Sequence, residues 1–217
     1  MTIRKYHLAA AGAALAAAVA LVACGSSSAP PGTSGSTTPQ PTATTPAAAP
    51  TTVTAADVAF TTGMLRLENQ AAALAALVPA HTTTAQLRQF AVGLDEHAAE
   101  FQQMRGMMGQ WGRAAPAPYT PGATPPAGTG PGMLGPGGWD EMGHMHGGDF
   151  NDHFADAMIA NRTAETALCR AELSHGASPQ ARALARTMLT QRQAELTQLQ
   201  AWHHQWEHSN DHDMMHG

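Results

Sequence analysis

Histidine and methionine, two residue types that bind transition metals, gather in two stretches of this sequence. The chain holds 12 of each among 217 residues. One stretch, residues 142–146, reads Met-Gly-His-Met-His, and the other covers residues 203–216. Imidazole suits copper, zinc and nickel, whereas thioethers select reduced copper, so the mixture predicts copper as the cofactor. The candidate metal ligands are His144, His146, His203, His204, His208, His212, Met214, Met215 and His216.

The geometry of the second stretch depends on whether a helix continues past Trp206. In a continued helix, His204, His208 and His212 lie at i, i+4 and i+8 on one face, where neighbouring pairs could chelate one ion. Ser209 and Asn210 oppose the continuation. The alternative is a flexible polar tail, residues 209–217, whose histidines serve solubility or respond to pH.

An internal repeat predicts the elements that must position these residues. Seven residues recur 94 residues later, or 95 residues later from Glu195 onward. They are Phe60, Met64, Leu74, His81, Arg88, Ala91 and Glu100, which recur as Phe154, Met158, Leu168, His175, Arg182, Ala185 and Glu195. A unit that cannot bury its apolar face alone needs a partner, and the simplest partner is the other copy.

Apolar spacing of three and four residues predicts two helices in each copy. Residues 54–112 form a first antiparallel hairpin, with a capping box at Thr54-x-x-Asp57, a first helix that ends at Pro79 and an unbroken second helix of about 28 residues. Residues 149–208 form a second hairpin, in which Asp149 caps one helix, Gly176 ends it and Ser178-Pro179 begins the next. The sequence thus predicts an all-α protein, a four-helix bundle of two duplicated hairpins.

Residues 113–148 join the two hairpins as a Gly-, Pro- and Met-rich crossover. Its prolines lack the amide hydrogen that a helix interior needs, so we expect no regular helix there. They are Pro116, Pro118, Pro121, Pro125, Pro126, Pro131 and Pro136.

The N-terminal sequence predicts export and a lipid anchor. Arg4 and Lys5 precede an Ala-rich apolar run, so residues 1–23 are typical of a secretory signal peptide. The run ends in Leu-Val-Ala-Cys-Gly, which resembles the lipobox of bacterial lipoproteins and predicts lipidation of Cys24. Residues 24–53 form a disordered Ser/Thr/Pro/Ala tether, which places the folded part on the extracytoplasmic face of the cell membrane. The alternative is an ordinary signal peptide followed by an incidental cysteine.

Charge and cysteine usage exclude some classes of function. Loss of residues 1–23 removes two of the 11 basic residues and none of the 16 acidic ones, which leaves a formal charge of −7. Such a chain, without a basic stripe, is not expected to bind nucleic acid. Once Cys24 is lipidated, Cys169 has no cysteine partner within the chain, and we interpret it as a small core residue.

Several helix positions that should be apolar are polar instead. They are His97, Asn161, Glu165, Gln191 and Glu195. They could form a metal centre, as in carboxylate-bridged bundles, or a hydrogen-bonded core layer. The Glu-x2-His motif of di-iron sites is absent and the order here is His97-x2-Glu100, which favours the hydrogen-bonded layer.

The pattern D-x2-F-x3-M followed by E-x3-M-x2-[MW], duplicated behind a lipoprotein signal, resembles the domain-of-unknown-function 305 family. The resemblance covers residues 57–111 and 151–206 and implies a ferritin-like four-helix bundle, with a link to copper in the bacterial envelope. It also implies a Met-x2-His-His signature in each copy. Here Met64 is followed by Leu65-Arg66-Leu67-Glu68 and Met158 by Ile159-Ala160-Asn161-Arg162, so both dihistidines are absent.

No arrangement typical of an enzyme occurs in the sequence, neither a nucleophile elbow nor a phosphate loop, so we expect no catalysis. The leading hypothesis is an envelope lipoprotein that binds or buffers copper, or another transition metal, through its His- and Met-rich segments. The rival hypothesis is a metal-free structural or interaction module of the envelope that presents an acidic surface to a protein partner.

Overall fold

A computed structural model describes residues 52–216, and within them the side chains of all but Asp95, Glu96 and residues 207–216. The signal peptide, Cys24 and nearly all of the tether lie outside the described residues. Every regular element in the described range is helical, which confirms the all-α prediction. The elements are α1 (Ala55–His81), α2 (Ala85–Gly93), the 3-10 helix η1 (Leu94–His97), α3 (Ala98–Gln110), α4 (Pro136–His144), α5 (Gly147–His175) and α6 (Pro179–His216).

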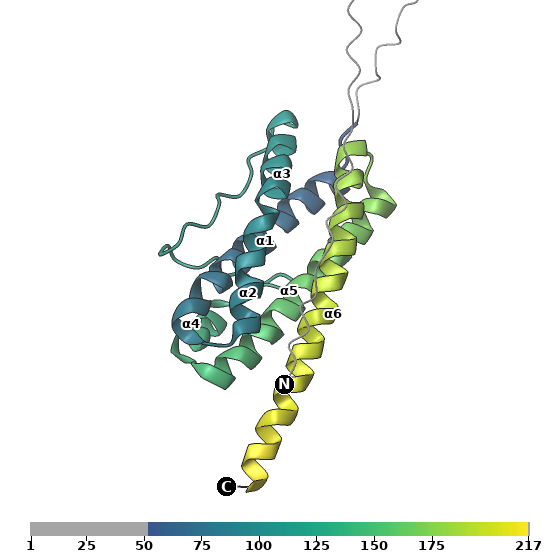
Figure 1. Cartoon of the computed structure of the whole chain (residues 1–217). Coiled ribbons are helices and arrows are strands. Elements are labelled where there is room, and N and C mark those ends of the chain that lie inside the picture. The colour runs from purple at the N-terminus through teal and green to yellow at the C-terminus, as the bar shows by residue number, and fades with distance from the viewer. Residues whose placement is uncertain (1–51, 217) are drawn as a thin grey trace, which may run out of the picture. The chain divides into compact units, whose positions relative to one another are not determined.

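Two long helices, α5 and α6, pack side by side and α1 lies against α5 (Figure 1). After α1 the chain turns back, and α2, η1 and α3 pack along α1. α3 also contacts α6. The crossover between α3 and α5 carries the short α4 (Figure 1). None of the helices within residues 52–216 is both long and apolar enough to cross a membrane.

The predicted helix starts are present, and one of them also links two helices. Thr54 N donates to Asp57 Oδ2 at 2.6 Å while Asp57 N donates to Thr54 Oγ1 at 3.3 Å, which is the predicted capping box. The carboxylate of Asp57 also accepts from Ala177 N at 3.1 Å and Ser178 N at 2.8 Å. Ser178 in turn caps α6 by accepting from Ala181 N at 3.2 Å. One aspartate therefore ties the start of α1 to the turn between α5 and α6.

Two predicted helix boundaries were wrong. α1 continues through Pro79 to His81, so this proline lies in the last turn of the helix and does not end it. α5 begins at Gly147 with His146 as its N-cap, so Asp149 lies in the first turn and is not the cap. Gly176 follows the last residue of α5, as predicted.

The predicted second helix and the predicted crossover also differ from the structure. The single long helix expected up to Gly112 is divided into α2, η1 and α3, because residues 94–97 form a tighter 3-10 turn. The crossover was expected to contain no helix, yet Pro136–His144 forms α4. Pro136 is its first residue, where the missing amide hydrogen would have no helical partner in any case.

The buried core consists of two apolar clusters. One cluster surrounds Leu74, Phe90, Phe154 and Leu199, with Trp202 and Trp206 packed against it. The other surrounds Phe60, Met64, Met104, Cys169 and Met188. Between these clusters, α1, α5 and α6 bury several polar and charged side chains, so a polar layer crosses the bundle between two apolar halves. They are Glu68, Gln70, Asn161, Arg162, Glu165, Thr166 and Arg192. Burial raises the pKa of the Cys169 thiol to about 12, as expected for a packed core residue.

Candidate functional site

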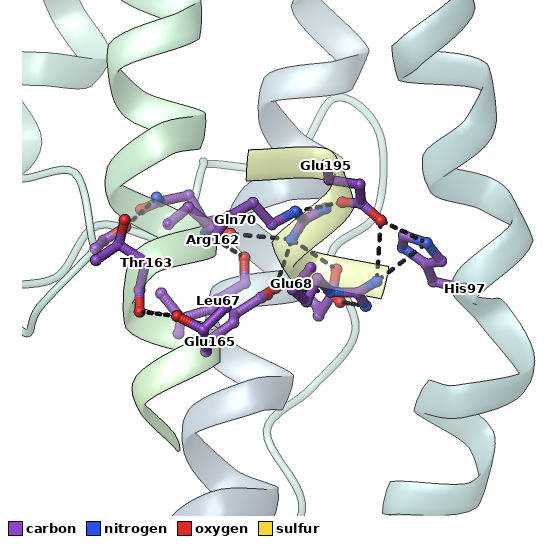
Figure 2. A network of polar contacts seen from close by, with 12 residues as sticks. Leu67, Glu68, Gln70, His97, Arg162, Thr163, Glu165 and Glu195 are labelled. Atoms are coloured by element: carbon purple, nitrogen blue, oxygen red, sulfur yellow. Dashed lines mark hydrogen bonds and ion pairs between the residues drawn. The ribbon is translucent and has the colours of Figure 1, made fainter. Parts of the chain in front are cut away.

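The polar layer is built from two buried arginines, four glutamates and one histidine. Figure 2 shows Glu68, His97, Arg162, Glu165 and Glu195 directed toward one another from different helices. Arg162, Arg192 and Glu165 are fully buried, and Glu68 is 3% exposed. Arginine and glutamate are almost never buried this deeply without partners. We call this set the charge layer: Glu68, His97, Glu100, Arg162, Glu165, Arg192 and Glu195.

Arg192 lies at the centre of the charge layer and uses all three of its nitrogens. Its Nε donates to Glu165 Oε2 at 2.8 Å. Its Nη1 lies 3.1 Å from His97 Nε2 and donates to Glu195 Oε1 at 3.2 Å. Its Nη2 donates to Glu100 Oε2 at 3.1 Å and to Glu68 Oε1. A single guanidinium thus contacts side chains from α1, η1, α3, α5 and α6, and it links these five elements in the core.

Arg162 makes the contacts on the other side of the charge layer. Its Nη1 donates to Glu165 Oε2 at 2.8 Å and to Asn161 Oδ1 at 3.1 Å, and lies 3.6 Å from Glu68 Oε2. Its Nε lies 2.7 Å from Glu195 Oε2, a close ion pair without the alignment of a hydrogen bond. Charge-assisted contacts of this kind are the strong ones in protein interiors.

Repeat-related positions meet each other in this layer. Glu68 and Arg162 are 94 residues apart and form an ion pair. Their neighbours Leu67 and Asn161 show the same separation, and Asn161 Nδ2 donates to the Leu67 carbonyl at 2.9 Å. His97 and Arg192 also touch, and their separation of 95 residues is the one that relates Glu100 to Glu195. Contacts between equivalent positions are those expected beside a twofold axis.

The carboxylates of the charge layer do not share one electrostatic environment. Although burial raises it, the pKa of Glu195 falls to about 2 because His97, Arg162 and Arg192 stabilise the ionised form. Burial raises the pKa of Glu165. Arg162 and Arg192 lower this pKa and the nearby Glu68 and Glu195 raise it further, so that the net shift is upward. Four carboxylates facing two guanidiniums therefore keep one member of the set easier to protonate than the rest.

The sequence prediction of this layer was partly right. His97, Asn161, Glu165 and Glu195 lie in it, but Gln191 is exposed and Arg192 takes the buried position. The spacing from the buried Met188 and Arg192 to the half-buried Glu195 is four then three, whereas the predicted positions Met188, Gln191 and Glu195 are three then four apart. The sequence analysis also missed Glu68 and Arg162 as layer residues. The signal for both was available, since they occupy repeat-related positions and carry opposite charge.

Three donor atoms of this layer lie close enough to hold a metal ion. One atom each from Glu68, His97 and Glu100 lie within 4.8 Å of one another, and among the described residues no other trio of His, Cys, Asp or Glu does so. However, Arg192 contacts all three side chains. The guanidinium is a permanent cation at this point, so the layer as it stands does not fit a metal ion.

Two of the predicted ligands, His144 and His146, lie near the C-terminal end of α1, around α4 and the start of α5. His146 is exposed and its ring stacks on that of His81, with centroids 4.7 Å apart and planes 8° apart. His81 also stacks on Phe150 at 5.0 Å. We call this pair, with the adjoining residues 142–145, the histidine corner. The sequence analysis did not connect His81 with His146, because nothing in a linear pattern relates positions 65 residues apart.

Backbone carbonyls fix the tautomer of two histidines in this corner. Nδ1 of His81 lies 2.7 Å from the Met145 carbonyl, and Nδ1 of the exposed His144 lies 2.7 Å from the Asp140 carbonyl. A carbonyl only accepts, so Nδ1 donates and the neutral ring keeps its lone pair on Nε2. Metal-binding histidines are commonly held in this way, with the second ring nitrogen free to bind the ion.

The predicted ligands on α6 are only partly within the described side chains. Nε2 of the half-buried His203 lies 3.4 Å from Asp156 Oδ1, which pairs α6 with α5, and His204 is exposed. α6 continues to His216, so the backbone meets the condition that places His204, His208 and His212 on one face. The side chains of His208, His212, Met214, Met215 and His216 lie outside the description.

A family model described as a domain of unknown function, DUF305, matches residues 57–203. The chain belongs to the DUF305 family. The dihistidine positions that the resemblance implies are the third and fourth residues after Met64 and Met158. They are Leu67 and Glu68 in the first copy and Asn161 and Arg162 in the second. In this DUF305 chain, the positions expected to carry dihistidines therefore form the hydrogen bond and the ion pair at the middle of the charge layer.

Solved structures share the fold at low sequence identity. A DUF305 fragment from Deinococcus radiodurans has a TM-score of 0.58 and 22% identity, over 70% of this chain and 98% of the fragment. A DUF305 protein from Streptomyces coelicolor, named as a secreted protein, has a TM-score of 0.56 and 19% identity, over 66% of this chain and 89% of its own. CopM in its Cu(II)-bound form has a TM-score of 0.55 and 17% identity, over 69% of this chain and 97% of its own. No curated protein sequence gives a significant match.

Proposed function

We propose that this protein is an extracytoplasmic, lipid-anchored and non-enzymatic copper-binding protein that holds the metal on the outside of its bundle, at the histidine corner and the end of α6. The signal sequence and Cys24 support the location and the anchor. A structural neighbour, CopM, has both Cu(II)-bound and Cu(I)-bound forms, which supports the choice of metal. Likeness at this identity carries the fold alone, so the proposal rests on the residues of this chain.

The observation that carries the proposal is the stacked pair of His81 and His146. The two rings are 4.7 Å apart, so modest side-chain rotations suffice to direct both at one ion. Nδ1 of His81 is already engaged by the Met145 carbonyl, which leaves Nε2 as the ligand atom. The thioether of the half-buried Met145 belongs to the same turn and is a soft ligand for Cu(I).

The test is copper affinity in the form without residues 1–24, measured for Cu(I) and Cu(II) in competition with a chelator. We expect dissociation constants below about 10 μM, and a loss of at least about 10-fold for the His81→Ala/His146→Ala double variant. The matched control is His175→Ala, because His175 is the repeat counterpart of His81 and is exposed at the end of α5. Equal affinities for the double variant and the control would contradict the assignment of the histidine corner.

The contribution of α6 is tested separately with a chain that ends at Trp206. This end point keeps Trp206, which stacks on Trp202 at 6.2 Å and packs on the apolar cluster. We expect the shortened chain to retain the corner site and to bind fewer copper ions.

A second candidate function is the metal-free structural or interaction module. The observation that favours it is the charge layer, in which Arg192 contacts the three side chains of the core metal trio. Binding weaker than about 10 μM for both copper states in the unshortened form would reject copper binding and leave this second function.

A further inference from the structure

The ligand trio in the core has the donor types that a metal ion needs. Carboxylate oxygens of Glu68 and Glu100 and an imidazole nitrogen of His97 lie within 4.8 Å of one another. Zinc binds such atoms at about 2.0 to 2.2 Å, which places tetrahedral ligands roughly 3.4 Å apart. Side-chain adjustments of about an ångström would therefore close the trio around an ion.

The same three side chains already share one cation. Arg192 Nη2 donates to Glu68 and, at 3.1 Å, to Glu100, while Arg192 Nη1 lies 3.1 Å from His97 Nε2. The guanidinium is fully buried. It thus supplies the positive charge and the convergent contacts that a bound ion would supply.

Without Arg192 the layer would be unbalanced. Glu68, Glu100, Glu165 and Glu195 would then face Arg162 as the remaining guanidinium in the set. An uncompensated buried charge is strongly unfavourable, so a core emptied of Arg192 must recruit a cation or lose stability.

We infer that the Arg192 guanidinium takes the place of a metal ion in this bundle, and that Glu68, His97 and Glu100 are a latent site for a divalent transition-metal ion, which loss of Arg192 opens. The core of the native protein is thereby closed to metal. This inference concerns the core alone and does not depend on copper binding at the surface.

The experiment compares Arg192→Ala with Arg162→Ala in the full chain, with Zn²⁺ as the probe. Both variants remove one fully buried guanidinium, but Arg162→Ala leaves Arg192 on the trio. We expect saturating Zn²⁺ to raise the melting temperature of Arg192→Ala by about 5 to 10 °C more than that of Arg162→Ala. Zn²⁺ bound by surface histidines should raise the melting temperatures of the two variants equally. Adding His97→Ala to Arg192→Ala should abolish the extra rise.

The inference can be tested even if Arg192→Ala folds poorly. If Arg192→Ala is unfolded without metal, Zn²⁺ should restore its helical circular dichroism, and it should do the same for Arg192→Gln. Variants that stay unfolded in Zn²⁺, or that gain no more than Arg162→Ala, would overturn the inference.

The unaltered chain supplies an independent check. Zn²⁺ at concentrations that shift the ring resonances of surface histidines should leave the nitrogen resonances of His97 and Arg192 Nε unchanged. A shift of both on addition of Zn²⁺ would mean that metal displaces the guanidinium, which also contradicts the inference.

Discussion

Glu68 and Arg162 occupy equivalent positions of the internal repeat and form an ion pair with each other in the core, at 3.6 Å between Oε2 and Nη1. A perfect repeat would place like residues at these positions, and like charges there would repel. This chain instead carries opposite charges at the two places where its family resemblance implies dihistidines. The two equivalent positions at the middle of this bundle thus carry an ion pair.

Loss of Arg162 should therefore destabilise the fold strongly. Arg162→Ala leaves buried carboxylates without a partner, and breaking a buried pair in this way costs about 3 to 5 kcal/mol in free energy of unfolding. The measurement is chemical denaturation followed by circular dichroism. Arg186→Ala is the control, because Arg186 is an exposed residue of α6, and its effect should stay within about 0.5 kcal/mol. Similar midpoints for the two variants would show that the charge layer is not needed for stability.

Asp57 at the start of α1 and Glu172 near the end of α5 make the stability of the fold depend on pH. Burial, followed by the neighbouring Asp57 carboxylate, raises the pKa of Glu172 from 4.5 to about 7. Glu172 is inaccessible to solvent, which supports the rise. Between pH 4.5 and 7 the folded state keeps this proton and the unfolded state releases it, so stability contributed by Glu172 is present below pH 4.5 and lost as the pH rises to 7.

Glu172→Gln should remove this contribution, because the neutral amide neither titrates nor gains a charge beside Asp57. We expect the free energy of unfolding of the variant to fall less than that of the parent between pH 5 and 8. At pH 8 the variant should be the more stable of the two. Curves that stay parallel over this range would place the titration elsewhere, for example at Glu165.

The crossover is fixed to the bundle at Gly132, beside the charge layer. Gly132 has φ +74°, and an added Cβ would come within 2.7 Å of Ala164 Cβ and 2.8 Å of the Ala160 carbonyl oxygen. The side chain of Gln70 holds this segment by donating to the Gly132 carbonyl and accepting from Leu134 N, both at 2.6 Å. Gly132→Ala combines backbone strain with a clash and should cost about 1 to 3 kcal/mol. Gly130→Ala, with open space around it, is the control and should change stability little; equal effects would contradict this reading.

Local signals predicted the helical parts well, and contacts between distant helices explain what they missed. Thr54-x-x-Asp57, Gly176 and Ser178-Pro179 act through neighbours in the chain, and each lies where it was predicted. The periodicity also placed Met64, Leu74 and Met188 in the core. The break in the second helix escaped prediction although Gly93 ends α2, because a single glycine inside a periodic pattern does not by itself end a helix.

The centre of the site was less accessible to sequence reasoning. Arginine is usually exposed, and burial of Arg192 depends on acceptors from α1, α3 and α5 that no linear pattern brings together. The stacking of His81 on His146 likewise depends on where α1 ends relative to α5.

The most direct test of the account is the position of bound copper. Crystals of the copper-loaded protein should give an anomalous copper peak beside His81 and His146, while Arg192 keeps its contacts to Glu68, His97 and Glu100. A copper peak between those three side chains, with Arg192 displaced, would contradict the account. So would a loaded protein whose copper lies away from both the histidine corner and the end of α6.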